Sequence, residues 1–418
     1  MTSCIRRLMM VVLAFLSLLT PAFAAEELSL KPLIAEALKN NREVLAAEAR
    51  VIAAGYRIQQ AKGMPDPLLS VGYQNEGLTQ YRYGDSLDAQ WILSASQTFP
   101  FFGKRGLKGE MAAADADSLR AVYETVRLKT TARIKELYYD LFLNYKNIDV
   151  IGEKTTLFAR LEESALSRYA SGTGGQQDIL MAQTEKYMLR EREEMFRQKI
   201  QSVEAMLGLT LGREDISPLG RPAPIADTPL DRKVEELIKT AYEGSPEIQT
   251  KKKLLAVAEA KTRMAKRETF PDLTVTAQTN QRGGEFTSMY SLMTSLNIPI
   301  YYKWKQEPAF LEATAAFQEA KHDLEATRIM TTANIRDSYA MAAAADRLMK
   351  LYRTALVPRA SQDFEAALAG YVTGKSDALT VINRLRTFLD VEILSWTQFV
   401  EKQKAMARLD ALTGKKED

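Results

Sequence analysis

The sequence is poor in the side chains that most catalytic and metal-binding sites require. Its 418 residues include one cysteine, Cys4, and one histidine, His322. A disulfide needs two cysteines, and zinc sites usually combine several cysteine or histidine ligands. The motifs G-x-S-x-G and H-E-x-x-H and the P-loop are also missing. We therefore expect no enzymatic activity, no cofactor and no bound metal, and we interpret His322 as a solvated residue on a helix face. Three methionines at seven-residue spacing, Met181, Met188 and Met195, are interpreted as a packed helix seam rather than a series of soft-metal ligands.

Long apolar runs are confined to the N-terminus. Two arginines precede an apolar stretch at residues 9–19, and an Ala-Phe-Ala sequence ends at Ala24. We expect residues 1–24 to be a signal peptide that is removed, and Cys4 with it. The remaining chain carries 54 basic residues (56 less the two arginines) and 53 acidic ones, a balance that gives no support for a nucleic-acid partner. No later run approaches the about 18 apolar residues of a transmembrane helix. Such an exported chain is soluble, surface-associated or a β-barrel.

The rest of the chain contains the same series of segments twice. Apolar residues at three- and four-residue spacing predict helices, and strict alternation predicts strands. The first series comprises helix 28–62, strands 68–75 and 90–98, a long helix 104–169 and helix 177–207. The second comprises helix 234–268, strands 273–281 and 289–298, a long helix 307–370 with a kink at Pro358, and helix 377–412. The first helix of each series contains an interruption, near residues 40–43 and 244–247.

This duplication indicates one structural unit used twice, with a period of roughly 200 residues. We therefore divide the chain into a signal peptide (1–24), a first repeat (25–212), a linker (213–229), a second repeat (230–414) and a C-terminal tail (415–418).

Each repeat supplies two strands of the length that crosses a membrane at a tilt. One side of the strands is apolar and suited to lipid: Leu69, Val71, Tyr73, Trp91, Leu93, Leu273, Val275, Ala277, Leu292, Leu296 and Ile298. The other side is polar and suited to a wet lumen: Ser94, Ser96, Thr98, Thr274, Thr276, Gln278, Ser291 and Ser295. Four strands cannot close a barrel and lipid does not tolerate open edges, so transmembrane strands require a dimer with eight strands or a trimer with twelve. The alternative is two ordinary hairpins in a soluble periplasmic protein.

Each long helix follows a strand through a short junction. At the first junction, Phe99 places an aromatic ring at the membrane interface, and Pro100 ends the strand because it has no N–H for the ladder. Gly103 then permits a sharp turn, and we expect Lys104 to begin the helix in water. The second junction keeps Pro299 but has no glycine. We interpret both junctions as structural boundaries.

Each long helix also ends at a turn marked by glycine, Gly172 in the first repeat and Gly374 in the second. Glycine allows left-handed backbone geometry at a tight corner between helices. The residues around the two turns correspond: Tyr169, Asp178 and Leu180 match Tyr371, Asp377 and Leu379. We expect the two aspartates to cap the helices that follow. A role in contacting a partner is compatible with capping.

Four strands, duplicated long helices, a secretory signal and glycine-marked turns together resemble the TolC-like outer-membrane efflux proteins. The resemblance covers residues 25–414. It implies an α+β membrane protein, a homotrimer whose twelve-stranded transmembrane β-barrel, four strands per chain, continues into a long periplasmic α-helical barrel. The junction sequence at residues 99–105 resembles that of the branch serving cation and heavy-metal efflux.

The resemblance also places the two turns at the periplasmic tip. There a periplasmic adaptor protein would be contacted by Tyr169, Gly172, Asp178, Tyr371, Gly374 and Asp377. Some family members close the tip with inward aspartates shortly after the second glycine. The corresponding residues here are Thr380 and Asn383, so an acidic ring does not carry over, and Asp377 is the nearest acid. Asp377, Thr380 and Asn383 are our candidate gate residues.

The function implied is a passive exit duct in the outer membrane that extends into the periplasm. An inner-membrane transporter of the resistance–nodulation–division type would deliver small solutes or metal cations to it through the adaptor. One alternative is an exit duct for type I protein secretion or multidrug export. Another, of a different class, is a soluble periplasmic coiled-coil scaffold. The sequence does not identify the substrate.

Overall fold

The computed structural model describes residues 27–214 and 218–415. The predicted signal peptide and Cys4 lie outside the described residues. The chain forms two compact units. Of the described residues, unit 1 contains 27–37, 133–214, 218–229 and 342–404, and unit 2 contains 38–132, 230–341 and 405–415. Each unit therefore takes segments from both predicted repeats.

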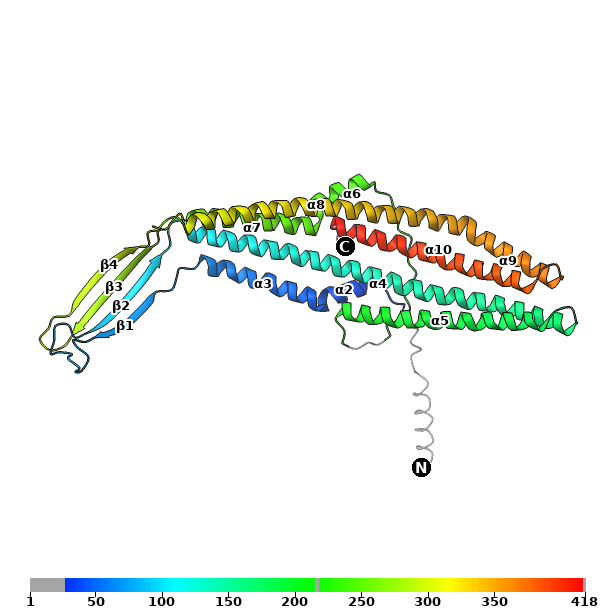
Figure 1. The fold of residues 1–418 in the computed structure, drawn as a ribbon, viewed down its shortest axis with the longest axis horizontal. Coiled ribbons are helices and arrows are strands. Elements are labelled where there is room, and N and C mark those ends of the chain that lie inside the picture. The colour runs from blue at the N-terminus through cyan, green and yellow to red at the C-terminus, as the bar shows by residue number, and fades with distance from the viewer. Residues whose placement is uncertain (1–26, 215–217, 416–418) are drawn as a thin grey trace, which may run out of the picture. The chain divides into compact units, whose positions relative to one another are not determined.

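The same order of elements occurs twice along the chain (Figure 1). The first series is α2 (Leu30–Asn40), α3 (Arg42–Lys62), β1 (Leu68–Gln74), β2 (Gln90–Phe99), α4 (Lys104–Ala170) and α5 (Gln176–Leu211). The second series is α6 (Val234–Gly244), α7 (Pro246–Arg267), β3 (Leu273–Arg282), β4 (Met289–Leu296), α8 (Gln306–Leu351), the π-helical turn η1 (Tyr352–Leu356), α9 (Val357–Val372) and α10 (Ala378–Thr413). The predicted elements are all present, with ends shifted by up to four residues.

Both predicted interruptions separate helices. Asn41 is the N-cap of α3, because its side-chain oxygen accepts hydrogen bonds from the amides of Glu43 at 2.9 Å and Val44 at 3.1 Å. In the second series Ser245 precedes α7, and Pro246 occupies the first helical turn, where its missing N–H costs nothing. An asparagine cap in the first series and a proline in the second thus break the helix at matching places.

The second long helix changes its hydrogen-bond pattern just before Pro358, where the sequence predicts a kink. Pro358 lies at the start of α9, and the π-helical turn η1 directly precedes it. Proline cannot donate the hydrogen bond of a regular helix, and its ring crowds the carbonyl four residues earlier. A wider π turn relieves this crowding. The helix predicted at residues 307–370 is therefore three consecutive pieces.

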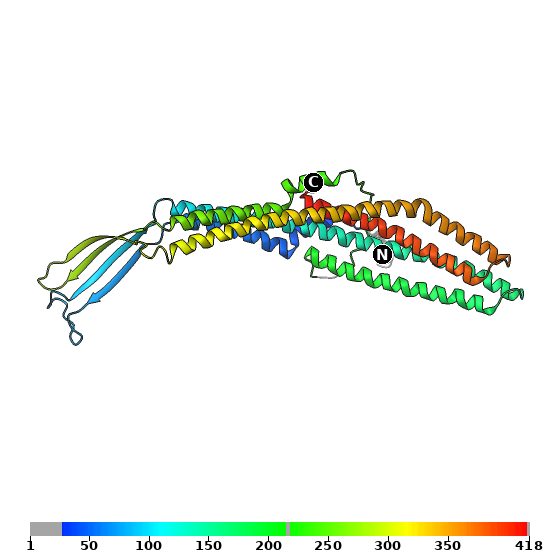
Figure 2. The ribbon, with the colours of Figure 1, turned by 45° about the horizontal axis from the view of Figure 1, so that its top comes forward.

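Unit 2 contains a four-stranded antiparallel sheet with the order β1-β2-β3-β4, and both views show the strands side by side (Figures 1 and 2). The register aligns the predicted faces across all four strands. Val71 pairs with Leu93, Ala95 pairs with Ala277, and Ala277 pairs with Leu292. Side chains alternate along each strand, so the apolar residues lie together on one face.

The two faces of the sheet differ in chemistry, as predicted. On the apolar face Leu69, Val71 and Leu292 are each at least 71% exposed, although such side chains are usually buried. On the polar face Ser96 and Thr276 hydrogen-bond across the strands at 2.9 Å, and Thr98 and Thr274 do so at 3.0 Å. A sheet that exposes a continuous apolar face needs a partner or an apolar environment to cover it.

Unit 1 is a packed set of helices formed by the end of α4, α5, α9 and α10. Its core contains large side chains that are fully buried, including Phe158, Leu161, Phe364 and Leu385. In the described part of the chain, no helix is long and apolar enough to cross a membrane.

The methionine prediction is wrong for two of its three residues within this chain. Met181 packs against the core of unit 1, but Met188 and Met195 are 44% and 52% exposed.

Candidate functional site

The turns after α4 and after α9 lie at the same end of unit 1 (Figures 1 and 2). Gly172 has a φ of +71° and Gly374 a φ of +76°, which confirms the predicted left-handed geometry. At the first turn the amide of Thr173 donates to the carbonyl of Arg168 at 2.9 Å, and at the second turn an equivalent bond from Lys375 has a length of 2.7 Å. These bonds satisfy carbonyls that the helix ends leave without partners.

Tyr371 connects the two turns. Its side chain is only 1% exposed, and its hydroxyl donates to Asp178 Oδ2 at 2.9 Å. The guanidinium of Arg168 lies 4.7 Å from the centre of the Tyr371 ring and donates to the Tyr371 carbonyl and, at 3.1 Å, to the carbonyl of Thr173. Burial and the Asp178 carboxylate raise the pKa of Tyr371 to about 12. The hydroxyl therefore stays protonated and serves as a fixed donor.

The prediction that both aspartates cap helices is correct for one of them. Asp377 caps α10, since its Oδ1 accepts from the Thr380 amide at 2.8 Å. Asp178 does not cap α5: the N-cap is Gly175, which makes no side-chain bond. Asp178 lies within the first turn of that helix, where its charge is favourable to the helix dipole, and binds Tyr371 instead. Both turns have five residues, 171–175 and 373–377. The capping position therefore falls on Gly175 in the first turn and on Asp377 in the second, and Asp178 comes three residues after it.

The remaining candidates lie on the surface of the same end. Tyr169, which matches Tyr371 in the sequence, is 49% exposed. Asp377 and Asn383 are exposed and Thr380 is half-buried. Hydrogen bonds from the Thr380 hydroxyl and amide lower the pKa of Asp377 below its usual 3.8. The candidate gate residues thus occupy an accessible strip of α10, opposite its buried strip.

Ion pairs connect the first helical hairpin, α4 and α5, to the second, α9 and α10. The sequence indicates Arg386 as a residue that could pair with acids near the tip, but the acidic partners were not predicted. Arg386 on α10 binds Glu185 on α5 through both Nε, at 2.8 Å, and Nη2. Arg192 on α5 lies 3.2 Å from Asp390 on α10. The partners are about two hundred positions apart in the sequence, so no local spacing indicates them. Arg168 is similarly missed, because the residue before Tyr371 in the second repeat is Gly370.

The first strand-to-helix junction is a second candidate region and belongs to unit 2. Strand β2 ends at Phe99 directly before Pro100, and Gly103 has a φ of +85°, as predicted. The expectation that Lys104 lies in water is wrong. Its side chain is 3% exposed and its Nζ contacts Asp272 Oδ1 at 2.9 Å, Glu268 Oε2 at 3.2 Å and the Phe270 carbonyl at 2.9 Å.

Lys104 is buried because both repeats meet at this junction. Asp272 also accepts from the Phe101 amide at 2.8 Å, and the Phe101 and Phe270 rings stack with centroids 4.6 Å apart. A buried charge requires such partners. The second junction differs: β4 ends at Leu296, two residues earlier than predicted, and Pro299 is followed by a turn that includes an exposed Trp304.

Metal-binding geometry is not found in the described residues, which contain no group of three or more His, Cys, Asp or Glu side chains placed to hold an ion. The imidazole of His322 is 75% exposed, and its Nδ1 lies 3.8 Å from Glu325. This exposure agrees with the interpretation of a solvated helix-face residue.

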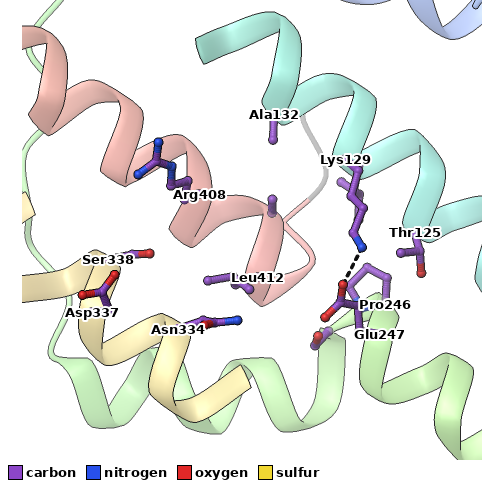
Figure 3. A pocket seen from close by; sticks show the side chains of 13 residues that line it. Thr125, Lys129, Ala132, Pro246, Glu247, Asn334, Asp337, Ser338, Arg408 and Leu412 are labelled. Carbon is purple, nitrogen blue, oxygen red and sulfur yellow. Dashed lines mark ion pairs between the residues drawn. The ribbon is translucent and has the colours of Figure 1, made fainter. Parts of the chain in front are cut away.

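A pocket of about 340 Å³ in unit 2 is lined by α4, α7, α8 and α10 (Figure 3). Lys129 and Glu247 form an ion pair at 2.7 Å on one side of it, and Asp337 and Arg408 lie on the other. Charges of both signs therefore surround the pocket, so it favours neither an anion nor a cation.

Comparison with known proteins agrees with the fold. The model of the family described as outer membrane efflux protein matches residues 33–213 and 237–415. The cobalt-zinc-cadmium resistance protein CzcC of Cupriavidus metallidurans is 22% identical over 405 residues, which cover 94% of this chain and 92% of that protein.

Among solved structures, CusC superimposes with a TM-score of 0.79 at 16% identity, covering 93% of this chain and 92% of the other. The outer membrane protein VceC of Vibrio cholerae gives a TM-score of 0.77 at 19% identity, covering 92% and 96%. These likenesses show the fold of an outer-membrane efflux channel, and the family match extends over most of the sequence. The chain therefore belongs to the outer membrane efflux protein family.

Proposed function

We propose that the protein is the passive exit duct of a tripartite efflux system and works as a homotrimer. Members of this family are outer-membrane transport proteins, not enzymes. The observation that carries the proposal is the four-stranded sheet, whose apolar face exposes large side chains along β1, β2 and β4 and is half-buried along much of β3. Its outer strands, β1 and β4, each pair on one side only within the described sheet. Unpaired strand edges cannot remain open in lipid.

Three copies would supply twelve strands, enough to close a transmembrane barrel. The apolar face would then meet lipid and the Ser, Thr and Gln side chains of the other face would line a wet lumen. The helical part would form the periplasmic barrel. A soluble periplasmic scaffold is set aside, because the chain belongs to an outer-membrane family.

The cargo we propose is metal cations, supplied by an inner-membrane transporter of the resistance–nodulation–division type through a periplasmic adaptor. The support is the similarity to a cobalt-zinc-cadmium resistance protein over nearly the whole chain. A duct for drugs or for secreted proteins would have the same architecture. Arg282, at the end of β3, is the one charged residue on the polar face of the described strands. Its positive charge would not attract metal cations, so selection for them would rest with the inner-membrane partner.

The tip formed by the two turns is the proposed adaptor contact and gate. Tyr169, Gly172, Gly374 and Asp377 are exposed there. The contacts from Tyr371 to Asp178 and from Arg386 to Glu185 hold the two helical hairpins of one chain together. Opening would require these hairpins to separate, so breaking the contacts should favour an open tip.

Planar-bilayer conductance of the purified trimer tests whether the protein forms a duct, and we expect discrete channels from the wild type. Metal resistance of cells that contain the matching adaptor and pump tests whether the duct takes part in metal export. Gly374→Pro and Asp377→Arg should abolish metal resistance while heat-modifiable trimers remain. Glu325→Arg, the same kind of charge change at an exposed site in unit 2, is the control and should keep resistance. A wild-type monomer that forms no channels would exclude the duct, and full resistance in both tip variants would exclude the proposed contact.

A further inference from the structure

The first junction contains an apolar groove that the transport role does not use. It has a volume of about 560 Å³, within the range of sites for organic molecules. Its walls are mostly aromatic and aliphatic: Met64, Phe99, Phe101, Phe102, Leu273 and Leu296. Phe102 is 87% exposed, and its ring meets the Phe101 ring edge-on with centroids 6.1 Å apart. A ring so exposed to water is unfavourable unless something covers it.

The register of the sheet shows which face the groove belongs to. Phe99 pairs with Leu273, and Leu273 pairs with Leu296, so these three side chains lie together at the end of one face. That face is the apolar one, and the groove extends it to the beginning of α4. The groove is therefore on the side proposed to meet lipid, at the helical end of the sheet, and not on the side that would line the lumen.

Two arginines that form no ion pair within the described residues lie at this groove: Arg105 lines it, and Arg267 lies beside Gly103 in its wall. The neighbouring Lys104 is paired with two carboxylates, and Lys108 is close enough to Asp272 to lower the pKa of that carboxyl. Arg105, which lines the groove, donates from Nε and Nη2 to the Lys62 carbonyl at 3.2 and 2.8 Å. This contact fixes the guanidinium and leaves its Nη1 group for another acceptor.

Arg267 adds a second unpaired cation. Its guanidinium lies 5.7 Å from the Phe101 ring and 5.5 Å from the Phe270 ring. Its buried Nε has no hydrogen-bond partner in the described residues. A Cβ on Gly103 would come within 2.9 Å of Arg267 Nη2, so the charge lies directly beside the groove wall. Positive charge next to an exposed apolar groove complements an amphiphile with an anionic head.

We propose that this groove binds an anionic phospholipid of the periplasmic leaflet. Its acyl chain would lie along Phe99, Phe102 and Leu296, and its phosphate would accept hydrogen bonds from Arg105, with Lys108 adding charge. The inference rests on the proposed transmembrane sheet, which places the helical end of the apolar face at that leaflet. A lipid held there would fix the depth of the barrel in the membrane and cover the exposed rings.

The test measures binding of phosphatidylglycerol to the full-length protein, purified as its native assembly in mild detergent, by native mass spectrometry. We expect wild type to bind it in preference to zwitterionic phosphatidylethanolamine. Phe102→Ser should weaken binding about tenfold through lost apolar contact. Arg105→Gln should weaken it about tenfold through a lost charged hydrogen bond. Lys108→Gln, which disturbs no hydrogen bond of the protein, should reduce the preference for the anionic lipid.

Matched controls lie at the second junction. Trp304 is an 85% exposed aromatic residue and Lys303 an exposed cation, and neither lines the groove. Trp304→Ser and Lys303→Gln should bind phosphatidylglycerol as wild type does. The inference would be overturned if all five variants bound phosphatidylglycerol as strongly as the wild type does. It would also be overturned if the wild type preferred lipopolysaccharide to phosphatidylglycerol.

Conductance and trimer content of the same preparations separate the two proposals. Channels and trimers without selective lipid binding would overturn the lipid site and leave the duct intact. A wild-type protein that neither trimerises nor forms channels would overturn both.

Discussion

The turn after α4 and the turn after α9 have the same backbone and use their side chains differently. Each has a left-handed glycine three residues after a tyrosine, and each is followed by an aspartate. In the second turn the tyrosine is buried and the aspartate caps a helix, whereas in the first the tyrosine is exposed and the aspartate binds the other tyrosine. Because the two turns pack together, Tyr371 takes the buried position and Tyr169 is left at the surface. Asp178 then accepts the hydrogen bond of the buried Tyr371 hydroxyl. The two turns therefore share their backbone geometry more closely than the roles of their side chains.

Truncating the two tyrosines should give the largest difference. Tyr371→Ala removes a fully buried ring and should cost about 3–5 kcal/mol, whereas Tyr169→Ala, at the surface, should cost less than about 0.5 kcal/mol. Thermal unfolding of the purified trimer, followed by the helical circular-dichroism signal, measures both. Equal losses of Tm in the two variants would contradict the assigned asymmetry.

Alkaline pH should reveal the same asymmetry. The pKa of Tyr371 is raised from its usual 10 to about 12, so the unfolded chain loses this proton before the folded one. Its contribution to stability is therefore complete below pH 10 and is lost between pH 10 and about 12. The loss should amount to roughly 2–3 kcal/mol. Tyr371→Phe should remove this part of the alkaline destabilisation and Tyr169→Phe should keep it. Identical Tm-versus-pH curves for the two variants would exclude the assignment.

Removing Asp178 should have a smaller effect. Asp178→Ala leaves the buried Tyr371 hydroxyl without its acceptor, at a cost of about 1–3 kcal/mol. Adding Tyr371→Phe should recover part of this loss, because no unsatisfied hydroxyl then remains. If the contact also holds the tip closed, Asp178→Ala should raise single-channel conductance. Strict additivity of the two substitutions would show that the hydrogen bond contributes nothing.

The two turn glycines should be equally sensitive, since this is the part that duplication has preserved. Gly172→Ala and Gly374→Ala each force a Cβ into left-handed geometry and should cost about 1–2 kcal/mol. Gly152, inside α4 with no atom within 4 Å of an added Cβ, is the control, and Gly152→Ala should stabilise the helix by up to about 1 kcal/mol. A large difference between the two turn variants would mean that the turns differ in backbone as well as in side chains.

The extent of the helices and strands could be predicted because each element carries its own periodic signal. The long apolar pattern that begins at Lys104 forms a helix that ends at Ala170, one residue past the prediction. The left-handed backbone at Gly172 and Gly374 was also predictable, because it follows from the residue type at a tight turn. Strand faces were predictable for the same reason, since alternation depends on neighbouring residues only.

Side-chain partners at the site could not be predicted in this way. Lys104 was expected in water because lysine at a helix start usually is, but it meets Asp272, 168 positions later in the sequence. Asp178 was expected to cap because its counterpart does, but Tyr371 lies 193 positions away and attracts it. Contacts between repeats depend on tertiary packing, which local spacing does not record.

Replacing the capping aspartate should give the smallest effect of the series. Asp377 is exposed, and its bond to the Thr380 amide can be retained by an amide oxygen, so Asp377→Asn should unfold almost as wild type does at neutral pH. Asp377→Ala should lower Tm by less than Asp178→Ala does. Because the pKa of Asp377 is lowered in the folded state, its charged form contributes stability above pH 3.8, and this contribution is lost as the pH falls through the lowered value. Tm measured down the acid limb should therefore fall less steeply in Asp377→Asn than in wild type. If Asp377→Ala lowered Tm more than Asp178→Ala, the cap of the second turn would matter more than the tyrosine contact of the first.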